Sequence, residues 1–354
     1  MREDHTGWED KLEPLESLDI RATERVSDLL SQMSKTAFGA RELGDAYSVL
    51  QKIASDPYCL TVVTLSGAMT VAKMGLVLCE MINMGLADII VSTGALIVHG
   101  LCESTGGTHF KHSSRLPDET LYQWGYNRIY DTLELEANFG ETELFLEDLF
   151  AEAANSPSTC SATLTKAIGR KLVRSNRMPG ILGAAYLREV PVYIPAFTDS
   201  ELGLMFSRYQ VLRARSGGNG DDLNQLLSGF RPNFNPFLDL HDYVQRIVRA
   251  KTLAIFTIGG GVPRNWAQQA APFVQTFSEE LDFKVQVPRF RYGVRICPEP
   301  VHWGGLSGCS YSEGISWGKF VSPEEGGAFA EVHCDATIAW PLLIRAALEF
   351  KQAK

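Results

Sequence analysis

The stretch CLTVVTLSGAMTVAKMGLVLCEMINMGLADIIVSTGA, residues 59–95, decides the fold. It opens with Cys59–Leu65, an apolar run rich in β-branched residues that is typical of a strand buried on both faces. A helical pattern then runs from Ser66 to Met84 and stops at Gly85, and Leu86–Val91 is a second buried strand. Two strands joined through a helix within about thirty residues form a β-α-β unit, which predicts a parallel sheet.

The alternation of helix and strand continues on both sides of this unit. We expect a leading helix across Val26–Leu50 and two further buried strands at Val190–Pro195 and Leu253–Ile258. The tail, Ala339–Lys351, has the spacing of an apolar helix that packs in the core. Together these patterns predict an α/β protein built on a parallel sheet.

No feature of the sequence divides the chain into separate units. The 354 residues contain no internal repeat and no long low-complexity tract, so we expect a single domain over residues 1–354. Residues 1–24 are interpreted as an N-terminal extension. Residues 215–234, RSGGNGDDLNQLLSGFRPNF, are rich in glycine and asparagine and are interpreted as a loop insertion, either a lid or a surface excursion.

The composition excludes several classes of function. The chain has 33 basic and 42 acidic residues, and a formal net charge of −9 argues against a nucleic-acid partner while it attracts small cations. The apolar region Leu60–Leu101 is interrupted by charged residues, and the start of the chain lacks a secretion signal, so we expect no membrane span. The seven cysteines form no CxxC pair, which predicts reduced thiols in a cytoplasmic protein.

A candidate nucleophile lies in the segment EGISWGKF, residues 313–320. Lys319 stands between a glycine and an aromatic residue, with Trp317 two positions before it. An amine attacks a carbon only when it is neutral, and an apolar setting favours the neutral form because it withholds water from the ammonium ion. The alternative is a surface lysine whose methylene groups lie on Trp317.

Several polar segments follow predicted parallel strands and indicate a nucleotide site. Ile258–Pro263 leaves a strand, turns on three glycines and enters a helix, which would expose backbone N–H groups to a phosphate. Ser66, Thr93 and Asp199 also follow strands, and the ends of parallel strands converge on one crevice. The glycine run lacks the GxGxxG spacing of the usual dinucleotide fingerprint, so an ordinary strand-to-helix turn is the alternative for that segment alone.

Metal and hydrolase chemistry are not expected. His109 and His112, or Cys297, His302 and Cys309, lack the paired short spacing of zinc sites, so no metal is predicted. A serine hydrolase is disfavoured as well, because no GxSxG elbow follows a strand.

Three segments near the C-terminus, IGGGV (258–262), EGISWGK (313–319) and HCDATIAWPLL (333–343), resemble the motifs of deoxyhypusine synthases in the same order. PAFTDSELG (195–203), VTLSG (63–67) and IIVSTGA (89–95) are similar to further segments of that family. The resemblance extends from about residue 25 to the end of the chain. It implies a Rossmann-like parallel sheet with helices on both faces, bound NAD, and a homotetramer whose active sites lie at subunit interfaces.

The resemblance also implies an activity, the transfer of the aminobutyl group of a polyamine such as spermidine through an imine on Lys319. The acceptor is either a protein lysine, as in deoxyhypusine synthesis, or a free diamine, which would give homospermidine. Glu313 and Trp317 match positions in the substrate pocket, where Glu313 would pair with an ammonium group of the substrate and Trp317 would stack on its alkyl chain or on the cation. The positions that match NAD contacts are Ser66, Thr93, Asp199, Gly260, Gly261, Asp335 and Ala336.

The sequence departs from the family where acidic residues would hold the ammonium groups of the polyamine. Leu204, Trp303 and Leu306 occupy those positions, and Asn265 replaces a histidine after the glycine run. We place Trp303 and Asn265 among the substrate-binding positions, because a tryptophan face can bind a cation. These changes suit the deoxyhypusine synthase-like branch of the family. They also leave a second hypothesis open, in which an NAD-binding oligomeric scaffold has lost polyamine turnover.

Overall fold

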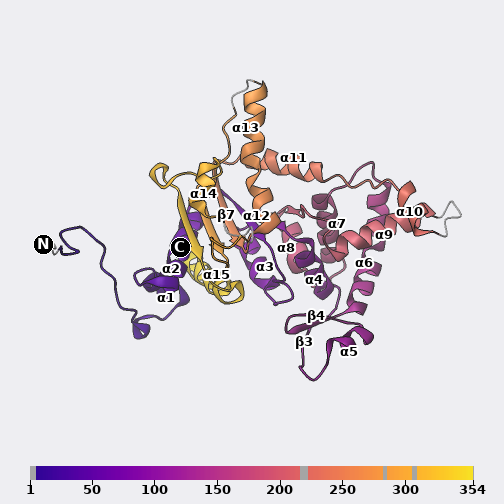
Figure 1. The fold of residues 1–354 in the computed structure, drawn as a ribbon, viewed down its shortest axis with the longest axis horizontal. Helices are drawn as coiled ribbons and strands as arrows, with labels where there is room; N and C mark the ends of the chain where they lie inside the picture. The colour runs from indigo at the N-terminus through magenta and orange to yellow at the C-terminus, as the bar shows by residue number, and fades with distance from the viewer. Residues whose placement is uncertain (1–4, 216–221, 282–284, 305–308, 354) are drawn as a thin grey trace.

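A six-stranded parallel sheet forms the centre of the molecule. The computed structural model describes residues 5–215, 222–281, 285–304 and 309–353 (Figure 1). The strands lie in the order β6-β2-β1-β7-β8-β9, and the fold class expected from the sequence is confirmed. Their bounds are β1 Cys59–Leu65, β2 Ile89–Ser92, β6 Val192–Tyr193, β7 Thr252–Ile258, β8 Tyr292–Ile296 and β9 Ala328–Val332.

Helices cover both faces of this sheet, which explains why its strands are apolar on both sides. In β1, Val63 and Leu65 pack in one core cluster, whereas Val62 packs in the other. The first cluster includes side chains from α2 Phe38–Ser55, α3 Gly75–Asn83, α4 Gly94–Ser104, α8 Gly180–Leu187 and α15 Ala336–Gln352. The second includes side chains from α11 Pro236–Ile247, α12 Gly261–Gln268, α13 Ala270–Leu281 and α14 Tyr311–Ser316.

The strand order reverses between β1 and β7. The chain passes outward from β1 to β2 and then to β6, and it returns to pair β7 with the free side of β1 before it continues to β8 and β9. The segments that follow β1 and β7 therefore leave the sheet side by side and depart toward different faces. A crevice at such a reversal is where open α/β sheets bind their ligands.

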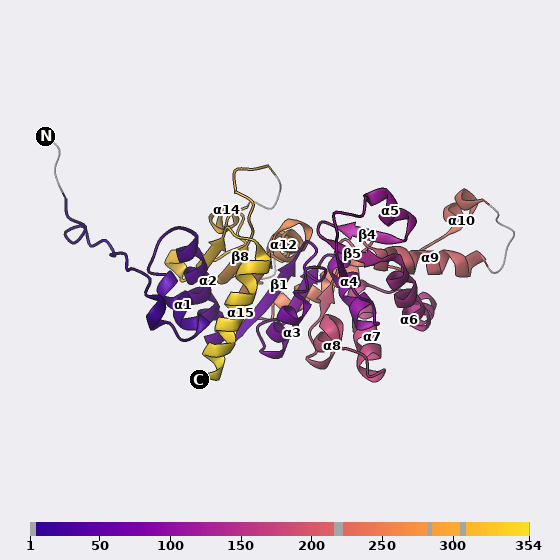
Figure 2. The same cartoon turned by 90° about the horizontal axis from the view of Figure 1, so that it is seen from below.

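A second, antiparallel sheet lies beside the first (Figure 2). Its order is β3-β5-β4, with bounds β3 Phe110–Lys111, β4 Tyr126–Ile129 and β5 Thr132–Leu135. The remaining helices are α1 Val26–Met33, α5 Asp118–Gln123, α6 Glu136–Asn155, α7 Ser161–Arg174, α9 Glu201–Arg215 and α10 Leu223–Gly229. Short 3-10 turns lie at Ile20–Ala22 and Pro323–Glu325. The sequence patterns did not predict the antiparallel sheet.

Two predicted helices have different bounds in the structure. The helix expected from Ser66 begins only at Gly75, because Lys73 has a φ of 65°, which the right-handed helix does not allow. The leading helix expected over Val26–Leu50 is two helices, α1 and α2, that cross at Gly44. A Cβ atom at Gly44 would lie 2.5 Å from the Cα atom of Ser34, so the crossing requires glycine.

Two other segments also differ from the prediction. The strand expected at Val190–Pro195 is only Val192–Tyr193, because β6 is an edge strand that pairs with two residues of β2. The segment 215–234, expected to be a loop, contains the helix α10. Its N-terminus is capped by Asp222, which accepts a hydrogen bond from the backbone of Asn224. Residues 216–221 lie outside the described part of the chain.

The N-terminal segment runs away from the body of the molecule (Figure 1), and residues 5–19 are exposed. Within the described ranges, no helix is both long enough and apolar enough to cross a membrane. All seven cysteines are free thiols, as the sequence analysis predicted.

Candidate active site

The segments after β1 and β7 meet at the reversal of strand order, through Ser66 and the glycine turn. The Ser66 hydroxyl accepts a hydrogen bond from the backbone N–H of Gly260 at 3.1 Å and donates one to the carbonyl of Ile258 at 3.2 Å. The turn requires glycine at two positions, since Gly259 and Gly261 have φ values of 75° and 59°. A Cβ atom at Gly259 would also collide with the Ser66 hydroxyl. The structure thus brings together two residues that lie almost two hundred positions apart in the sequence.

Thr93 and Asp199 lie at the next two strand ends along the same edge. Thr93 precedes α4, and its Oγ1 atom is buried without a hydrogen-bond partner within the described residues. Gly94 packs against Ser200 so closely that a Cβ atom there would lie 2.5 Å from the Cβ of Ser200. The carboxylate of Asp199, the preceding residue, is exposed beside this contact.

Asp335 and Ala336 follow β9 at the other end of the sheet. Asp335 caps α15 by accepting a hydrogen bond from the backbone of Thr337 at 2.7 Å, and Ala336 is buried. The residues matched to NAD contacts therefore all follow the C-terminal ends of parallel strands. Their chemistry fits a dinucleotide. The backbone N–H groups of the glycine turn can donate hydrogen bonds to a phosphate, and the Thr93 hydroxyl is free to bond a ligand. The exposed carboxylates of Asp199 and Asp335 can accept hydrogen bonds from ribose hydroxyls.

Lys319 lies just beyond α14, after a turn at Gly318 with a φ of 67°. Its backbone is fixed on both sides, because its N–H donates to Gly314 at 3.1 Å and its carbonyl accepts from Phe290 at 3.0 Å. The side chain is half-buried. Burial lowers the pKa of Lys319, and the nearby Arg264 guanidinium lowers it further, while Cys309 and Glu313 act in the opposite direction. A lowered pKa is the property that an amine nucleophile needs.

Trp317 and Glu313 lie close to Lys319: Glu313 is in the first turn of α14, and Trp317 is the residue that ends the helix. The Lys319 ammonium nitrogen is 5.4 Å from the centroid of the Trp317 ring, within cation–π range. Trp317 is 64% exposed and Glu313 is also exposed, so both side chains are open to an incoming amine. The exposed face of this group can bind a cation, whereas the buried side of Lys319 favours a neutral amine.

A pair of buried arginines connects this lysine to the glycine turn, and the sequence reasoning missed both. Arg264 donates to the carbonyl of Cys309 at 2.7 Å, and Arg295 donates to the same carbonyl at 3.2 Å. Arg295 also donates to the carbonyl of Gly259 at 3.3 Å. Nothing in the neighbouring sequence identifies either residue, because arginine side chains in helices and strands are usually exposed. The burial of these two side chains is evident only from the fold.

Arg264 has unused hydrogen-bonding capacity. Its Nε and Nη2 atoms are buried without partners in the described part of the chain, and so are the hydroxyl of Tyr311 and the amide nitrogen of Gln268. The Arg264 guanidinium lies 5.6 Å from the centre of the Tyr311 ring. Buried donors without acceptors are rare in folded proteins and indicate a site where a ligand or water completes the hydrogen bonds.

The other predicted substrate residues, Asn265 and Trp303, are exposed, and so is Leu204, one of the positions where the sequence departs from the family. Asn265 is exposed on α12, and Leu204 is exposed on α9. Trp303 is 60% exposed in the segment after β8, where its ring lies 6.3 Å from that of His302. Leu306 lies outside the described residues.

Acidic residues other than Glu313 do occur close to α14. A groove of about 820 Å³ runs between α2, α14 and β9. It is lined by Asp45, Glu324 and Glu331 together with Tyr311 and Ile315 of α14. The groove thus has three carboxylates and the ammonium group of Lys52 beside the helix that carries Glu313, and one of the carboxylates, that of Glu331, is paired with Arg295.

Comparison with known proteins decides the family. The model of the family described as deoxyhypusine synthase matches residues 28–347. The chain belongs to the deoxyhypusine synthase family. Members of this family are transferases of aminoalkyl groups, so the chain is an enzyme of the class that transfers alkyl groups other than methyl.

Individual relatives agree with this assignment. The chain is 30% identical over 322 residues to "Probable deoxyhypusine synthase 2" of Methanosarcina mazei, covering 91% of this chain and 86% of the relative. It is 30% identical over 340 residues to the "Deoxyhypusine synthase-like protein" of Chlorobaculum parvum, covering 94% and 88%. The crystal structure of a deoxyhypusine synthase homologue from Entamoeba histolytica has a TM-score of 0.57 at 12% identity, covering 95% of this chain and 97% of that one, and shares the fold.

Proposed function

We propose that this protein is an NAD-dependent aminobutyl transferase that receives the aminobutyl group of spermidine as an imine on Lys319 and passes it to an acceptor amine. The observation that carries the proposal is the environment of Lys319, which is half-buried, has a lowered pKa and lies beside an exposed tryptophan and an exposed carboxylate. The same residues match the family motif, and a lysine with only a surface role would not need a half-buried position that lowers its pKa.

The residues at the strand ends would hold the cofactor. Ser66, Gly260 and Gly261 would bind the phosphates, and Asp199 and Asp335 would accept hydrogen bonds from the ribose hydroxyls. Thr93 would use its unpartnered hydroxyl, and Ala336 would leave room for the ring that packs against it. When bound, NAD would take a hydride from the carbon next to the donor amine and later return it.

The neutral Lys319 amine would attack the oxidised donor at the carbon that carries its nitrogen. A carbon–nitrogen bond to Lys319 forms, and the bond to diaminopropane breaks, so that the aminobutyl group remains on the enzyme as an imine. The acceptor amine then displaces Lys319 in the same manner. Arg264 favours this exchange because its positive charge disfavours the ammonium form of Lys319.

The charged ammonium groups of the polyamine would be held at the surface, away from the half-buried side of Lys319. Glu313 and Trp317 are exposed close to Lys319, and Asn265 and Trp303 are exposed on α12 and in the segment after β8. The carboxylates of the groove beside α14 would supply the negative charge that the leucine at position 204 does not. A buried ammonium without a carboxylate would cost several kcal/mol, so the charged groups of the substrate are expected to stay at this open surface.

The acceptor is either a protein lysine or a free diamine such as putrescine, and we propose a homotetramer with active sites at its interfaces. Large exposed apolar side chains around the site support the assembly, since Val262 of α12 and Trp303 and Trp317 are all more than half exposed. We also propose that the enzyme acts in the cytoplasm. Sedimentation analysis of the purified protein would test the tetramer directly.

The decisive experiment traps the covalent intermediate. The protein is incubated with NAD and spermidine labelled in its aminobutyl part, treated with borohydride and digested, and the labelled peptide is identified by mass spectrometry. We expect the label on Lys319 and none in the Lys319→Arg variant. Lys251→Arg is the matched control, because Lys251 also lies over an aromatic ring, 4.1 Å from that of Tyr58, but on the exposed surface.

Adding an acceptor distinguishes the two reactions. Putrescine would release labelled homospermidine, whereas a protein acceptor would itself become labelled on a lysine. Protein that binds NAD but carries no label on any lysine would exclude the transferase proposal and favour an NAD-binding scaffold.

A further inference from the structure

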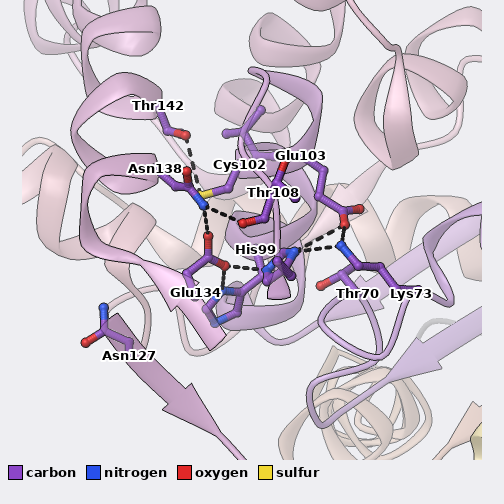
Figure 3. Close-up of polar contacts among 12 residues, drawn as sticks. Thr70, Lys73, His99, Cys102, Glu103, Thr108, Asn127, Glu134, Asn138 and Thr142 are labelled. Atoms are coloured by element: carbon purple, nitrogen blue, oxygen red, sulfur yellow. Dashed lines mark hydrogen bonds and ion pairs between the residues drawn. The ribbon is translucent and has the colours of Figure 1, made fainter. Parts of the chain in front are cut away.

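A cluster of two histidines and a glutamate lies beside α4, apart from Lys319 and its neighbours. His99 comes from α4 and Glu134 belongs to β5 (Figure 3), and His109 immediately precedes β3. Glu134 is fully buried, and the two histidines are 9% and 8% exposed. One carboxylate oxygen of Glu134 lies 2.9 Å from Nδ1 of His99 and contacts Nε2 of His109. Three potential metal ligands therefore face one point in the interior.

The local structure explains why these three residues converge. In the antiparallel pairing of β3 with β5, Phe110 is opposite Leu133 and Lys111 is opposite Thr132. Continuing this register places His109 opposite Glu134. His99 approaches from the helix, one turn before Glu103, so both α4 residues face the small sheet. The cluster thus joins the antiparallel sheet to the helix that begins the proposed cofactor edge.

Neighbouring residues hydrogen-bond to the side chains of the cluster, as residues around the ligands of a metal site commonly do. Glu103 lies 3.2 Å from Nδ1 of His109, and Asn138 donates to the second oxygen of Glu134 at 2.6 Å. Metal-binding histidines generally donate their other ring N–H to a carboxylate, and ligating carboxylates are hydrogen-bonded in turn. Lys73 pairs with Glu103, and its ammonium nitrogen lies 2.8 Å from His109 Nδ1 (Figure 3). The cluster therefore already has its supporting partners.

One atom of the cluster lacks a hydrogen bond. Nε2 of His109 is buried, and among the residues that the structure describes it has no partner with hydrogen-bond geometry, although the Glu134 oxygen lies against it. A lone pair on this atom would be available to a metal if Nδ1 carried the ring proton and donated it to Glu103, with the Lys73 ammonium turned from Nδ1 toward the Glu103 carboxylate. The donor atoms of His99, His109 and Glu134 all lie within 4.8 Å of one another. Around tetrahedral zinc they would be about 3.4 Å apart, so binding requires only a small adjustment.

We propose that His99, His109 and Glu134 bind one divalent transition-metal ion of the zinc type. Two imidazoles and one carboxylate form a ligand set that suits zinc, and three protein ligands leave a fourth position for water. The ion would tie the antiparallel sheet to α4 and thereby support the loop that carries Lys73. The sequence analysis expected no metal and paired His109 with His112, but His112 is directed to the carbonyl of Leu116 at 3.4 Å.

The test measures metal binding and does not depend on transferase activity. The full-length protein is stripped with a chelator, dialysed against zinc, and analysed by inductively coupled plasma mass spectrometry. We expect one zinc ion per chain. His109→Gln and Glu134→Gln should bind no zinc at the same free concentration, whereas the matched control His112→Gln should bind as the parent does.

Two further measurements separate loss of binding from loss of folding. Glu103→Gln keeps all three ligands and alters a partly buried residue, so it should fold and weaken zinc affinity roughly 10- to 100-fold. Zinc should also raise the midpoint of thermal unfolding of the parent and of His112→Gln. Parent protein that binds no zinc would overturn the proposal, and so would a zinc affinity of Glu103→Gln equal to that of the parent.

Cobalt identifies the ligands by absorption spectroscopy. Cobalt bound by nitrogen and oxygen should give visible bands without the near-ultraviolet charge-transfer band of a cobalt–thiolate bond. A thiolate band would instead place the ion on one of the seven free cysteines and would also overturn the proposal.

Discussion

Replacing glycine by alanine is expected to have opposite effects at Gly94 and Gly140, although the added methyl group is the same. Gly94 is the first residue of α4, next to Thr93 at the proposed cofactor edge. A Cβ atom at Gly94 would lie 2.5 Å from the Cβ of Ser200 and 3.3 Å from Cγ2 of Ile194. Gly140 lies inside α6, and a Cβ atom there would meet nothing within 4 Å.

The neighbours of Gly94 cannot easily move away. Ser200 is buried, and its hydroxyl donates to the carbonyl of Phe197 at 3.0 Å and accepts from the N–H of Gly203 at 3.3 Å. Overpacking of this kind costs about 1–3 kcal/mol, so Gly94→Ala should lower the free energy of unfolding by that amount. In an open helical position alanine is favoured over glycine by about 0.8–1 kcal/mol, so Gly140→Ala should raise it.

The effect of Gly94→Ala should extend to cofactor binding, because Asp199 directly precedes the displaced Ser200. A loss of about 1.4 kcal/mol in binding would weaken NAD affinity tenfold. Urea unfolding of the two variants and of the parent gives the stabilities, and calorimetric titration with NAD gives the affinities. Equal stability of the two variants, or parent-like NAD affinity in Gly94→Ala, would refute the reasoning.

Substitutions at three further positions test individual contacts at the site. Ser66→Ala leaves the N–H of Gly260 without its acceptor, which should cost about 1–3 kcal/mol of unfolding free energy in urea titrations. Asp335→Ala removes the cap of α15 and should lower the free energy of unfolding by about 1 kcal/mol, whereas Asp335→Asn should keep the cap. Weaker NAD binding in both variants, measured by calorimetry, would show that the Asp335 carboxylate also contacts the ribose. Glu313 raises the pKa of Lys319, so Glu313→Gln should lower that pKa. Lys319 should then react with an acetylating reagent at a lower pH than in the parent, which peptide mass spectrometry can follow. A shift to higher pH would contradict the assigned effect of Glu313.

The central sheet was predictable because its evidence is local. Cys59–Leu65 and Leu253–Ile258 are apolar on both faces, and this pattern survives in any fold that buries them in a parallel sheet. Once these strands are predicted, the residues that follow their C-terminal ends are known as well. Because such ends lie at one edge of a parallel sheet, Ser66 and the glycine turn could be expected at the same edge. The exact contact between the Ser66 hydroxyl and the N–H of Gly260 depends on strand order, which no local pattern specifies.

Other features depend on contacts between distant residues. The start of α3 is delayed by the positive φ of Lys73, whose side chain pairs with Glu103, and nothing in the residue type of lysine predicts that conformation. His99, His109 and Glu134 converge only because β3 pairs with β5 beside α4. Burial of Arg264 and Arg295 likewise follows from the packing of α12 and β8, since arginine is usually exposed.

The distribution of charge around α14 has a consequence for the proposed reaction. Two buried guanidinium groups, Arg264 and Arg295, share the carbonyl of Cys309, and Glu331 pairs with only one of them at 3.3 Å. Burial of Lys319 and the positive charge of the nearby Arg264 both oppose protonation of the amine. The carboxylates of Glu313, and of Asp45 and Glu324 in the groove, are exposed. A polyamine would then keep its ammonium groups at the acidic surface, and only its uncharged reacting nitrogen would gain by approaching Lys319.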